Sequence, residues 1–465
     1  MGQYALGCAP TEYRPRSPEQ SVLYKAVANH IESFFAMVDN EGKHLPKFVR
    51  EEFDAFLRCG IHAYGFLRLK CSGCSSERFV AFSCKKRGFC TSCGGRRMSE
   101  SAAHLIDEVF PIVGIRQWVV SFPFPIRFLL LRSPALQSKI LSICLRAINS
   151  LIVKKANQKV KCGSVTLLQR FGGSLNANLH FHILVLEGGY VDSEFIYMPP
   201  PKDEEIKALV QTIAKRVVRA LKKLGHFADE NESIAEDAED SLAEIQAASV
   251  KNRIAMGKRR GELIRRIGAL SVGDPPELSG PLCANVAGFS LHADTYCAPN
   301  QREKLEKLCR YVARPAVAES RLKLKSNGDV LLKLKKPYSD GTSHLVFAPL
   351  EFLEKLAALV PPPRAHLTRF HGVLAPNAKI RSKVVPKKKE AKAKTPKSKR
   401  ISWAKLLKRV FAIDMENCTQ CGGKLELVAA IMEEAAVEKI LKHVGRPYKP
   451  PDIAPAEYPD RLPIF

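Results

Sequence analysis

The sequence predicts an α+β protein in which hairpins and amphipathic helices follow a zinc-ribbon-like module. Three observations predict this class. Short segments of alternating hydrophobicity occur in pairs joined by turn-rich loops, as in β-hairpins. Between these pairs lie longer segments with apolar residues at helical spacing. Ahead of both, two Cys-x-x-Cys pairs are spaced as in a zinc site.

The composition favours a polyanionic partner. Lys and Arg number 73 against 47 acidic residues in 465, a formal net charge of +26, which exceeds what solubility requires. No uninterrupted apolar run reaches about 18 residues, so we expect no membrane interaction. The first residues do not resemble a secretion signal, so we do not expect secretion. Fourteen cysteines in such a chain indicate thiolates that bind metal in a reducing compartment.

Residues 1–44 are predicted to form an N-terminal helical region, and residues 45–110 a zinc-binding module. Four thiolates of this module should surround one structural Zn²⁺, because fifteen residues separate its two Cys-x-x-Cys pairs. These ligands are Cys71, Cys74, Cys90 and Cys93. Cys59, His62 and Cys84 either contribute to a second site with one ligand unidentified or are ordinary buried residues.

The same module has a basic rim that we expect to lie on DNA phosphates. Its cations are Lys85, Lys86, Arg87, Arg96 and Arg97. A solvated surface without a ligand has the same composition, but the net charge of the chain favours the first interpretation.

Residues 111–360 are predicted to form one domain, with a helical insertion at about 200–280. A hairpin at 163–171 and 179–186 contains two histidines. His180 and His182 point to one face of the second strand, about 6.6 Å apart along it, so two imidazoles can bind one metal ion. The alternate residues are apolar and should face a core. An ordinary polar strand face has the same pattern.

A helix at 300–313 carries a tyrosine outside its apolar stripe. Tyr311 lies about 120° around the helix from Leu305. It projects from a basic face, and Pro315 ends the helix. The cations near it are Lys304, Lys307, Arg310 and Arg314. A tyrosine on such a face usually has no chemical role.

Residues 361–400 are predicted to be a basic linker, since its Lys-rich part lacks apolar periodicity. Residues 401–465 should form a C-terminal helical segment that contains Cys418 and Cys421. This pair is half a zinc site, because no cysteine follows it. His443 as a further ligand and a metal-free reduced pair both remain open.

Several motifs, taken in order, resemble the rolling-circle insertion-sequence transposases of the HUH endonuclease superfamily. They lie at residues 83–90, 169–172, 180–182, 308–315, 371–377, 402–404 and 418–423. The resemblance covers about residues 45–447. It implies an antiparallel-sheet catalytic core with helices on its faces, the histidine pair on a central strand and the tyrosine on a downstream helix. It also implies a bacterial cytoplasmic protein associated with the nucleoid.

The resemblance further implies cleavage and rejoining of single-stranded DNA at element ends through a 5′-phosphotyrosine, in a rolling-circle-like route. Tyr311 would be the nucleophile, and His180 and His182 would hold the cation that polarises the phosphate. Arg310 or Arg314 could steady the phosphate oxygens. Imidazole ligands alone suggest Zn²⁺ or Mn²⁺, whereas the family implies Mg²⁺ or Mn²⁺, which we adopt.

Two points depart from the family or stay open. Some members carry a second tyrosine four residues after the first, where this chain has Pro315, so the single-tyrosine version is expected. Strand exchange would then use a second protomer on the DNA, a reset of Tyr311, or the 3′ hydroxyl alone. The third metal ligand is either Gln169, which we favour, or His292, and strand register decides between them.

Two other functions fit parts of the sequence. A non-catalytic, zinc-dependent DNA-binding protein, such as a decayed transposase or a regulator, explains the charge and the cysteines. A zinc hydrolase would use His180 and His182 without covalent attachment to DNA. Only the transposase requires both histidines and Tyr311 together.

Overall fold

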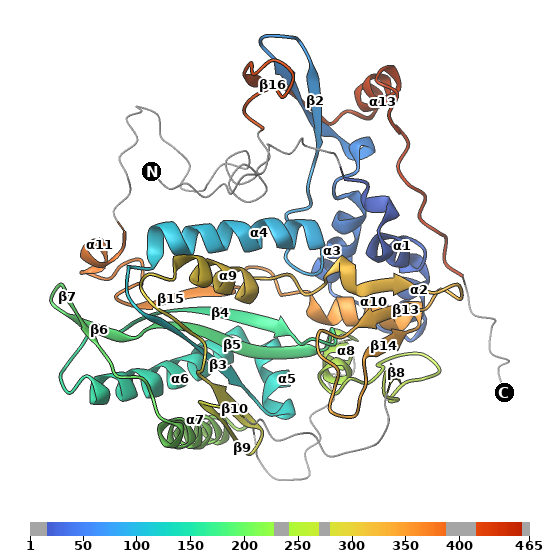
Figure 1. Cartoon of the computed structure of the whole chain (residues 1–465). Coiled ribbons are helices and arrows are strands. Elements are labelled where there is room, and N and C mark those ends of the chain that lie inside the picture. Colours follow the sequence, from blue (N-terminus) through green and yellow to red (C-terminus); the bar gives the residue numbers. More distant parts are fainter. Residues whose placement is uncertain (1–15, 227–240, 269–279, 387–414, 458–465) are drawn as a thin grey trace, which may run out of the picture.

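The structure, a computed structural model, describes residues 16–226, 241–268, 280–386 and 415–457. It is a mixed α+β fold with antiparallel sheets (Figure 1). Residues 387–400 of the predicted linker, and the motif at 402–404 with its flanking residues to 414, lie outside the described residues.

Three short helices form the N-terminal part. They are α1 (Val22–Ala28), α2 (Ile31–Asn40) and α3 (Lys47–Arg58), with a 3₁₀ turn at Pro18–Gln20 before them. Ser21 caps α1, because its hydroxyl accepts a hydrogen bond from the Tyr24 amide at 3.1 Å. Phe53 of α3 packs on Phe89 of the zinc-binding region, with ring centroids 4.8 Å apart. The N-terminal helices therefore share a core with the elements that follow.

A three-stranded sheet joins the two ends of the chain. Its order is β16 (Leu425–Ile431), β1 (Phe66–Cys71) and β2 (Glu77–Ala81). Behind it, α13 (Glu434–His443) packs Val437 and Leu441 on Phe66 and Phe79. In the linear order this C-terminal segment is remote from the zinc-binding module, yet it completes that module's sheet (Figure 1).

A seven-stranded antiparallel sheet forms the centre of the molecule. Its path is β15 (Thr368–Gly372), β4 (Gly163–Phe171), β5 (Ala177–Leu186), β3 (Ile115–Ser121), β10 (Phe289–His292) and β9 (Cys283–Val286), and β11 (Tyr296–Cys297) also pairs with β3. The predicted hairpin is confirmed as β4 and β5. The predicted linker begins too early, since β15 is an edge strand of this sheet. Its side chains have no clear alternation between buried and exposed, so periodicity could not reveal it.

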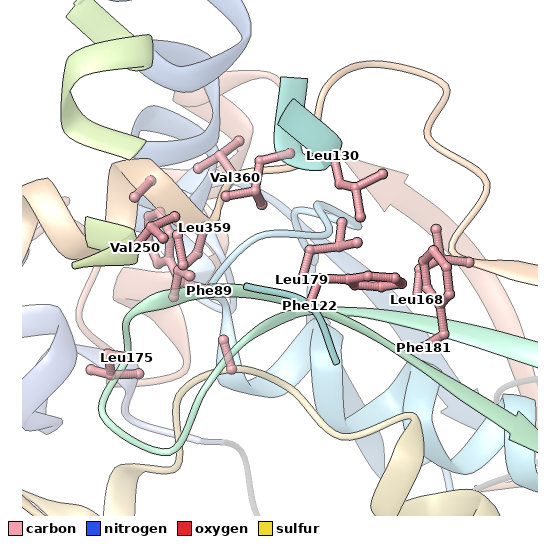
Figure 2. Packing of buried hydrophobic residues seen from close by; sticks show 14 of the residues in the cluster. Phe89, Phe122, Leu130, Leu168, Leu175, Leu179, Phe181, Val250, Leu359 and Val360 are labelled. Carbon is pink, nitrogen blue, oxygen red and sulfur yellow. The ribbon is translucent and has the colours of Figure 1, made fainter. Parts of the chain in front are cut away.

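Helices cover both faces of the central sheet (Figure 1). On one face lie α5 (Phe124–Arg132), α6 (Pro134–Lys155) and α7 (Asp203–Lys223). There Leu168, Leu179 and Phe181 pack with Phe122 of the β3–α5 connection (Figure 2). Among the described helices, α6 alone is long and apolar enough to span a membrane, but it is largely a buried core helix. The other face carries α4 (Thr91–His104), the π-helical turn Leu105–Val109 and α9 (Arg302–Val312).

The remaining elements lie around this centre. They are η2 (His62–Tyr64), the hairpin β6 (Gly188–Val191) and β7 (Glu194–Tyr197), α8 (Ser241–Val250), η4 (Glu319–Arg321), α10 (Pro349–Leu359), α11 (Arg381–Val384), and the sheet of β12 (Leu322–Leu324), β13 (Val330–Lys333), β14 (His344–Phe347) and β8 (Arg265–Ile267). The hairpin β12–β13 places Lys335, which follows it, against Tyr311.

Candidate metal centres and tyrosine site

Four cysteines, from the end of α3 to the first turn of α4, form the first thiol cluster. They are Cys59, Cys84, Cys90 and Cys93. The sulfur of Cys59 lies 3.7 Å from those of Cys90 and Cys93, and the sulfurs of Cys84 and Cys93 are 3.4 Å apart. Tetrahedral Zn²⁺ with bonds of about 2.3 Å places its sulfurs about 3.8 Å apart. The Cys84 amide donates to the sulfur of Cys59 at 3.3 Å, which further supports a thiolate there. The cluster suits one structural zinc.

A second thiol cluster joins the β1–β2 turn to the segment before β16. Its members are Cys71, Cys74, Cys418 and Cys421. Cys71 lies 3.4 Å from Cys421, and Cys74 lies 3.6 Å from Cys418, sulfur to sulfur. Gly423 is required by this packing, since a Cβ there would lie 2.9 Å from the sulfur of Cys71. This cluster also suits structural zinc, with ligands 344 residues apart in the sequence.

The predicted grouping of Cys71, Cys74, Cys90 and Cys93 around one ion is therefore wrong. Each pair belongs to a different cluster. Antiparallel pairing of β16 with β1 brings the distant Cys418 knuckle to Cys71, whereas Cys59 and Cys84 complete the site of Cys90 and Cys93. Of the two alternatives left open for Cys59, His62 and Cys84, Cys59 and Cys84 lie in a thiol cluster, with Cys90 and Cys93 as its other members, and His62 is not part of it.

Both histidines of the hairpin lie on β5 and point to the face covered by α9. Their Nε2 atoms are 3.1 Å apart. Two nitrogens at about 2.1 Å from one cation and 3.1 Å from each other subtend about 95° at it, close to the cis angle of octahedral coordination. The intervening Phe181 is fully buried on the opposite face. The pair can therefore hold one divalent cation.

The other ring nitrogens are held by fixed partners. Nδ1 of His180 lies 2.9 Å from the carbonyl oxygen of Asn178, to which it donates, leaving Nε2 free to act as a ligand. Nδ1 of His182 lies 2.6 Å from the side-chain amide of Gln117 on β3. Gln117 was missed in the sequence, because only the register of β3 against β5 brings it there.

Both imidazoles are neutral at physiological pH. Burial, together with the charges of Arg127 and Arg314, lowers the pKa of His180 to about 4, although the hydrogen bond to Asn178 acts in the opposite direction. The pKa of His182 also falls well below its usual value, mainly through burial. A neutral imidazole is the form that binds metal.

Tyr311 lies over this pair on α9. Its ring stands at 86° to that of His182, with centroids 6.3 Å apart. As predicted, Tyr311 lies outside the buried stripe of α9 and is 46% exposed, whereas Leu305 is 2% exposed. The structure thus brings together the two motifs that the sequence places far apart.

Two cations flank the phenol ring. The Arg314 guanidinium lies 4.4 Å from the Tyr311 centroid and 5.8 Å from that of Phe171. Lys335 lies 5.2 Å from the Tyr311 centroid. None of the ion pairs among the described residues includes Arg314 or Lys335. The site therefore has positive charge available for a phosphate, and Lys335 was not among the predicted residues.

The two candidates for a third ligand occupy different positions. Gln169 pairs directly with His180, so its side chain points to the same face, where its amide lies 3.5 Å from the Val312 carbonyl. His292 pairs with Val119, which in turn pairs with His182, so a whole strand separates the two histidines. This geometry favours Gln169.

The predicted DNA-binding cations differ in their surroundings. Lys86, Arg96 and Arg310 form ion pairs with Glu51, Glu100 and Glu306. Arg87 and Arg97 instead donate to backbone carbonyls: Arg87 to Ala365, and Arg97 to Lys85 and Lys86. Lys304 and Lys307 lie on α9 with Tyr311.

Two family models match parts of the chain. Residues 163–383 match a Y2-type family described as "Putative transposase", and residues 26–122 match the IS91-type transposase zinc-binding domain. The chain carries a transposase domain behind a transposase zinc-binding domain. No curated protein and no solved structure matches it. The match to the transposase family implies DNA binding and a DNA-cleaving enzyme.

The matched ranges divide the two thiol clusters of the transposase. The zinc-binding match includes all of the first cluster but only Cys71 and Cys74 of the second. Cys418 and Cys421 lie beyond both matches. The transposase match includes His180, His182 and Tyr311.

Proposed function

We propose that the transposase cleaves and rejoins single-stranded DNA at the ends of an insertion sequence through a 5′-phosphotyrosine at Tyr311, by a rolling-circle-like route. The observation that carries this proposal is the contact of Tyr311 with His182, beside the paired Nε2 atoms of the two histidines. A structural role would need neither this pairing nor the unneutralised cations around the phenol.

Each residue has a defined part in the proposed reaction. His180 and His182, with Gln169 as the favoured third ligand, would hold Mg²⁺ or Mn²⁺, which polarises the scissile phosphate and offsets its developing charge. The Tyr311 oxygen attacks phosphorus and loses its proton to solvent. The bond from phosphorus to the 3′ oxygen breaks, and this oxygen takes up a proton from solvent and leaves as the 3′ hydroxyl. Arg314 and Lys335 neutralise the phosphoryl oxygens.

The product supports rejoining without another energy source. The DNA 5′ phosphate stays esterified to the phenol, so one phosphodiester has been exchanged for another. A 3′ hydroxyl can then attack this linkage, which releases Tyr311 and joins a strand. Pro315, just beyond α9, stands where a second tyrosine would lie, so we propose that a second protomer on the DNA, the reset Tyr311 or the 3′ hydroxyl alone completes the exchange.

The test is formation of a covalent adduct. The protein is incubated with single-stranded oligonucleotides from both sides of its gene, with Mg²⁺ or Mn²⁺, and resolved on a denaturing gel. We expect a protein–DNA adduct that Tyr311→Phe abolishes and that Tyr197→Phe, at a comparably exposed tyrosine, retains.

The same gel separates the alternatives. DNA binding without adduct or cleavage supports a non-catalytic, zinc-dependent DNA-binding protein. Cleaved DNA without an adduct supports a metal-dependent hydrolase that uses His180 and His182. Either result would overturn the phosphotyrosine mechanism.

A further inference from the structure

A cavity of about 600 Å³ lies beside the end of β4. The start of α6 forms one wall, and residues 362–370 form another. Leu168 and Leu179, which pack near Leu130 in the core (Figure 2), line it together with Arg170. His180, His182 and Tyr311 do not line this cavity.

Arg170 is a buried cation without an anionic partner. It is 4% exposed, and none of the ion pairs among the described residues includes it. Its Nη1 donates to the Leu131 carbonyl at 3.2 Å, while Nε and Nη2 are buried without a hydrogen-bond partner in the described structure. Burial lowers the pKa of Arg170 to about 10, so it stays charged at neutral pH. A buried charge is costly unless it is paired, which indicates a missing anion.

The lining of the cavity suits one nucleotide. Arg364, His366 and Arg369 line it with Arg170, and none of the described residues that line it carries a carboxylate. Arg369 is oriented by a 2.8 Å hydrogen bond to Ser138. Prolines, leucines and Phe370 form the apolar part of the wall. A basic group for the phosphate next to apolar and aromatic surface for a base is how single strands are bound.

The cavity adjoins the proposed reaction site. Arg170 follows Gln169, which pairs with His180, and the β4–β5 register is irregular between Gln169 and Phe171. Arg170 also lines a smaller cavity of about 110 Å³, together with Gln169 and Arg314. Arg314 likewise has a buried Nη1 without a partner. Unpaired guanidinium groups therefore extend from Tyr311 to the larger cavity.

We propose that this cavity binds one nucleotide of the single strand next to the cleavage position, with its phosphate on Arg170 and Arg369 and its base against the apolar wall. The proposal rests on the proposed function, because it takes single-stranded DNA as the substrate. It adds a binding site on the sheet face opposite the histidines.

The test measures binding in a Tyr311→Phe background, so that it does not depend on cleavage. We expect Arg170→Met to keep or raise the melting temperature without DNA, to weaken binding of a single-stranded oligonucleotide about tenfold, and to reduce the slope of log affinity against log salt by about 0.7. Arg216→Met, which removes an exposed arginine from α7, should change affinity less than twofold.

A second variant, Arg369→Gln, and a phosphate control complete the test. Arg369→Gln, at a less buried residue of the same cavity, should weaken binding several-fold, and it decides the matter if Arg170→Met does not fold. Full affinity in Arg369→Gln, or a lower melting temperature with full affinity in Arg170→Met, would overturn the proposal. The proposal would also be overturned if inorganic phosphate stabilises the protein and Arg170→Met abolishes this effect but leaves the affinity for the oligonucleotide unchanged. Adduct formation in Tyr311-containing protein is scored separately, so failure of the phosphotyrosine mechanism remains distinguishable.

Discussion

Gln117 should determine how tightly the histidine pair binds a divalent cation. Its side-chain amide lies 2.6 Å from Nδ1 of His182, and the residue is 4% exposed. When Nε2 of His182 is a metal ligand, Nδ1 carries the proton and donates. The amide of Gln117 then has to present its oxygen, which a half-turn of the amide group achieves.

Replacing Gln117 with Leu keeps the approximate volume but leaves that proton without an acceptor. A buried donor without a partner costs about 1–3 kcal/mol. Loss of the partner of a metal-binding histidine weakens metal affinity by about 10- to 100-fold. We expect a loss of this size for Mn²⁺ in Gln117→Leu, and Gln117→Glu should restore the affinity, because a carboxylate accepts the same hydrogen bond.

Calorimetric titration of zinc-replete protein with Mn²⁺ measures this effect. Gln211→Leu, at an exposed glutamine of α7, is the matched control. Zinc content and melting temperature establish that the cysteine clusters and the fold are intact. An Mn²⁺ affinity in Gln117→Leu within twofold of wild type, in a folded protein, would refute the assignment of Gln117 as the residue that positions His182.

Three further predictions concern the rest of the molecule. Two thiol clusters predict two Zn²⁺ per chain, and Cys418→Ser should lower the content measured by atomic emission to one while DNA adducts still form. In Gly94→Ala the new Cβ would lie 2.6 Å from Cβ of Pro315, so adduct formation should slow by about 10- to 100-fold at full zinc content; an unchanged rate would contradict this. Burial, and next the charge of Arg369, lower the pKa of His371 to about 4. Below pH 6.5 the unfolded chain therefore takes up a proton at this histidine before the folded protein does, and the free energy of unfolding falls by about 3 kcal/mol as the pH approaches 4. His371→Gln should reduce that loss in acid denaturation followed by circular dichroism, and an equal loss in both proteins would exclude His371 as its source.

Local periodicity was enough to predict the main elements of the site. The alternation around His180 and His182 located both residues on one strand face, and the apolar stripe of α9 placed Tyr311 outside the buried face. Each inference needs only a few consecutive residues, because strand and helix geometry repeat at fixed intervals. The hairpin β4–β5 was predictable for the same reason.

Contacts between distant segments were not predictable in this way. Gln117 reaches His182 only through the register of β3 against β5, and a shift of one residue would turn it away. The second zinc cluster depends on β16 pairing with β1. Nearest spacing along the chain favoured Cys90 and Cys93 as partners of Cys71 and Cys74. The sequence contains eight cysteines that divide into two complete sets of four, and this number was the signal that could have indicated two zinc sites.

The packing of α4 explains why a zinc module should accompany the nucleophile. Cys93 is a ligand of the first cluster and lies in the first turn of α4, followed by Gly94. Gly94 packs so closely against Pro315 that no Cβ fits between them, and the preceding Arg314 stacks on Tyr311. Zinc at the first cluster therefore fixes the start of α4, and α4 in turn limits where the end of α9 can lie. On this reasoning, the first zinc supports the position of the tyrosine as well as the fold of its own module, whereas the second holds the C-terminal strand.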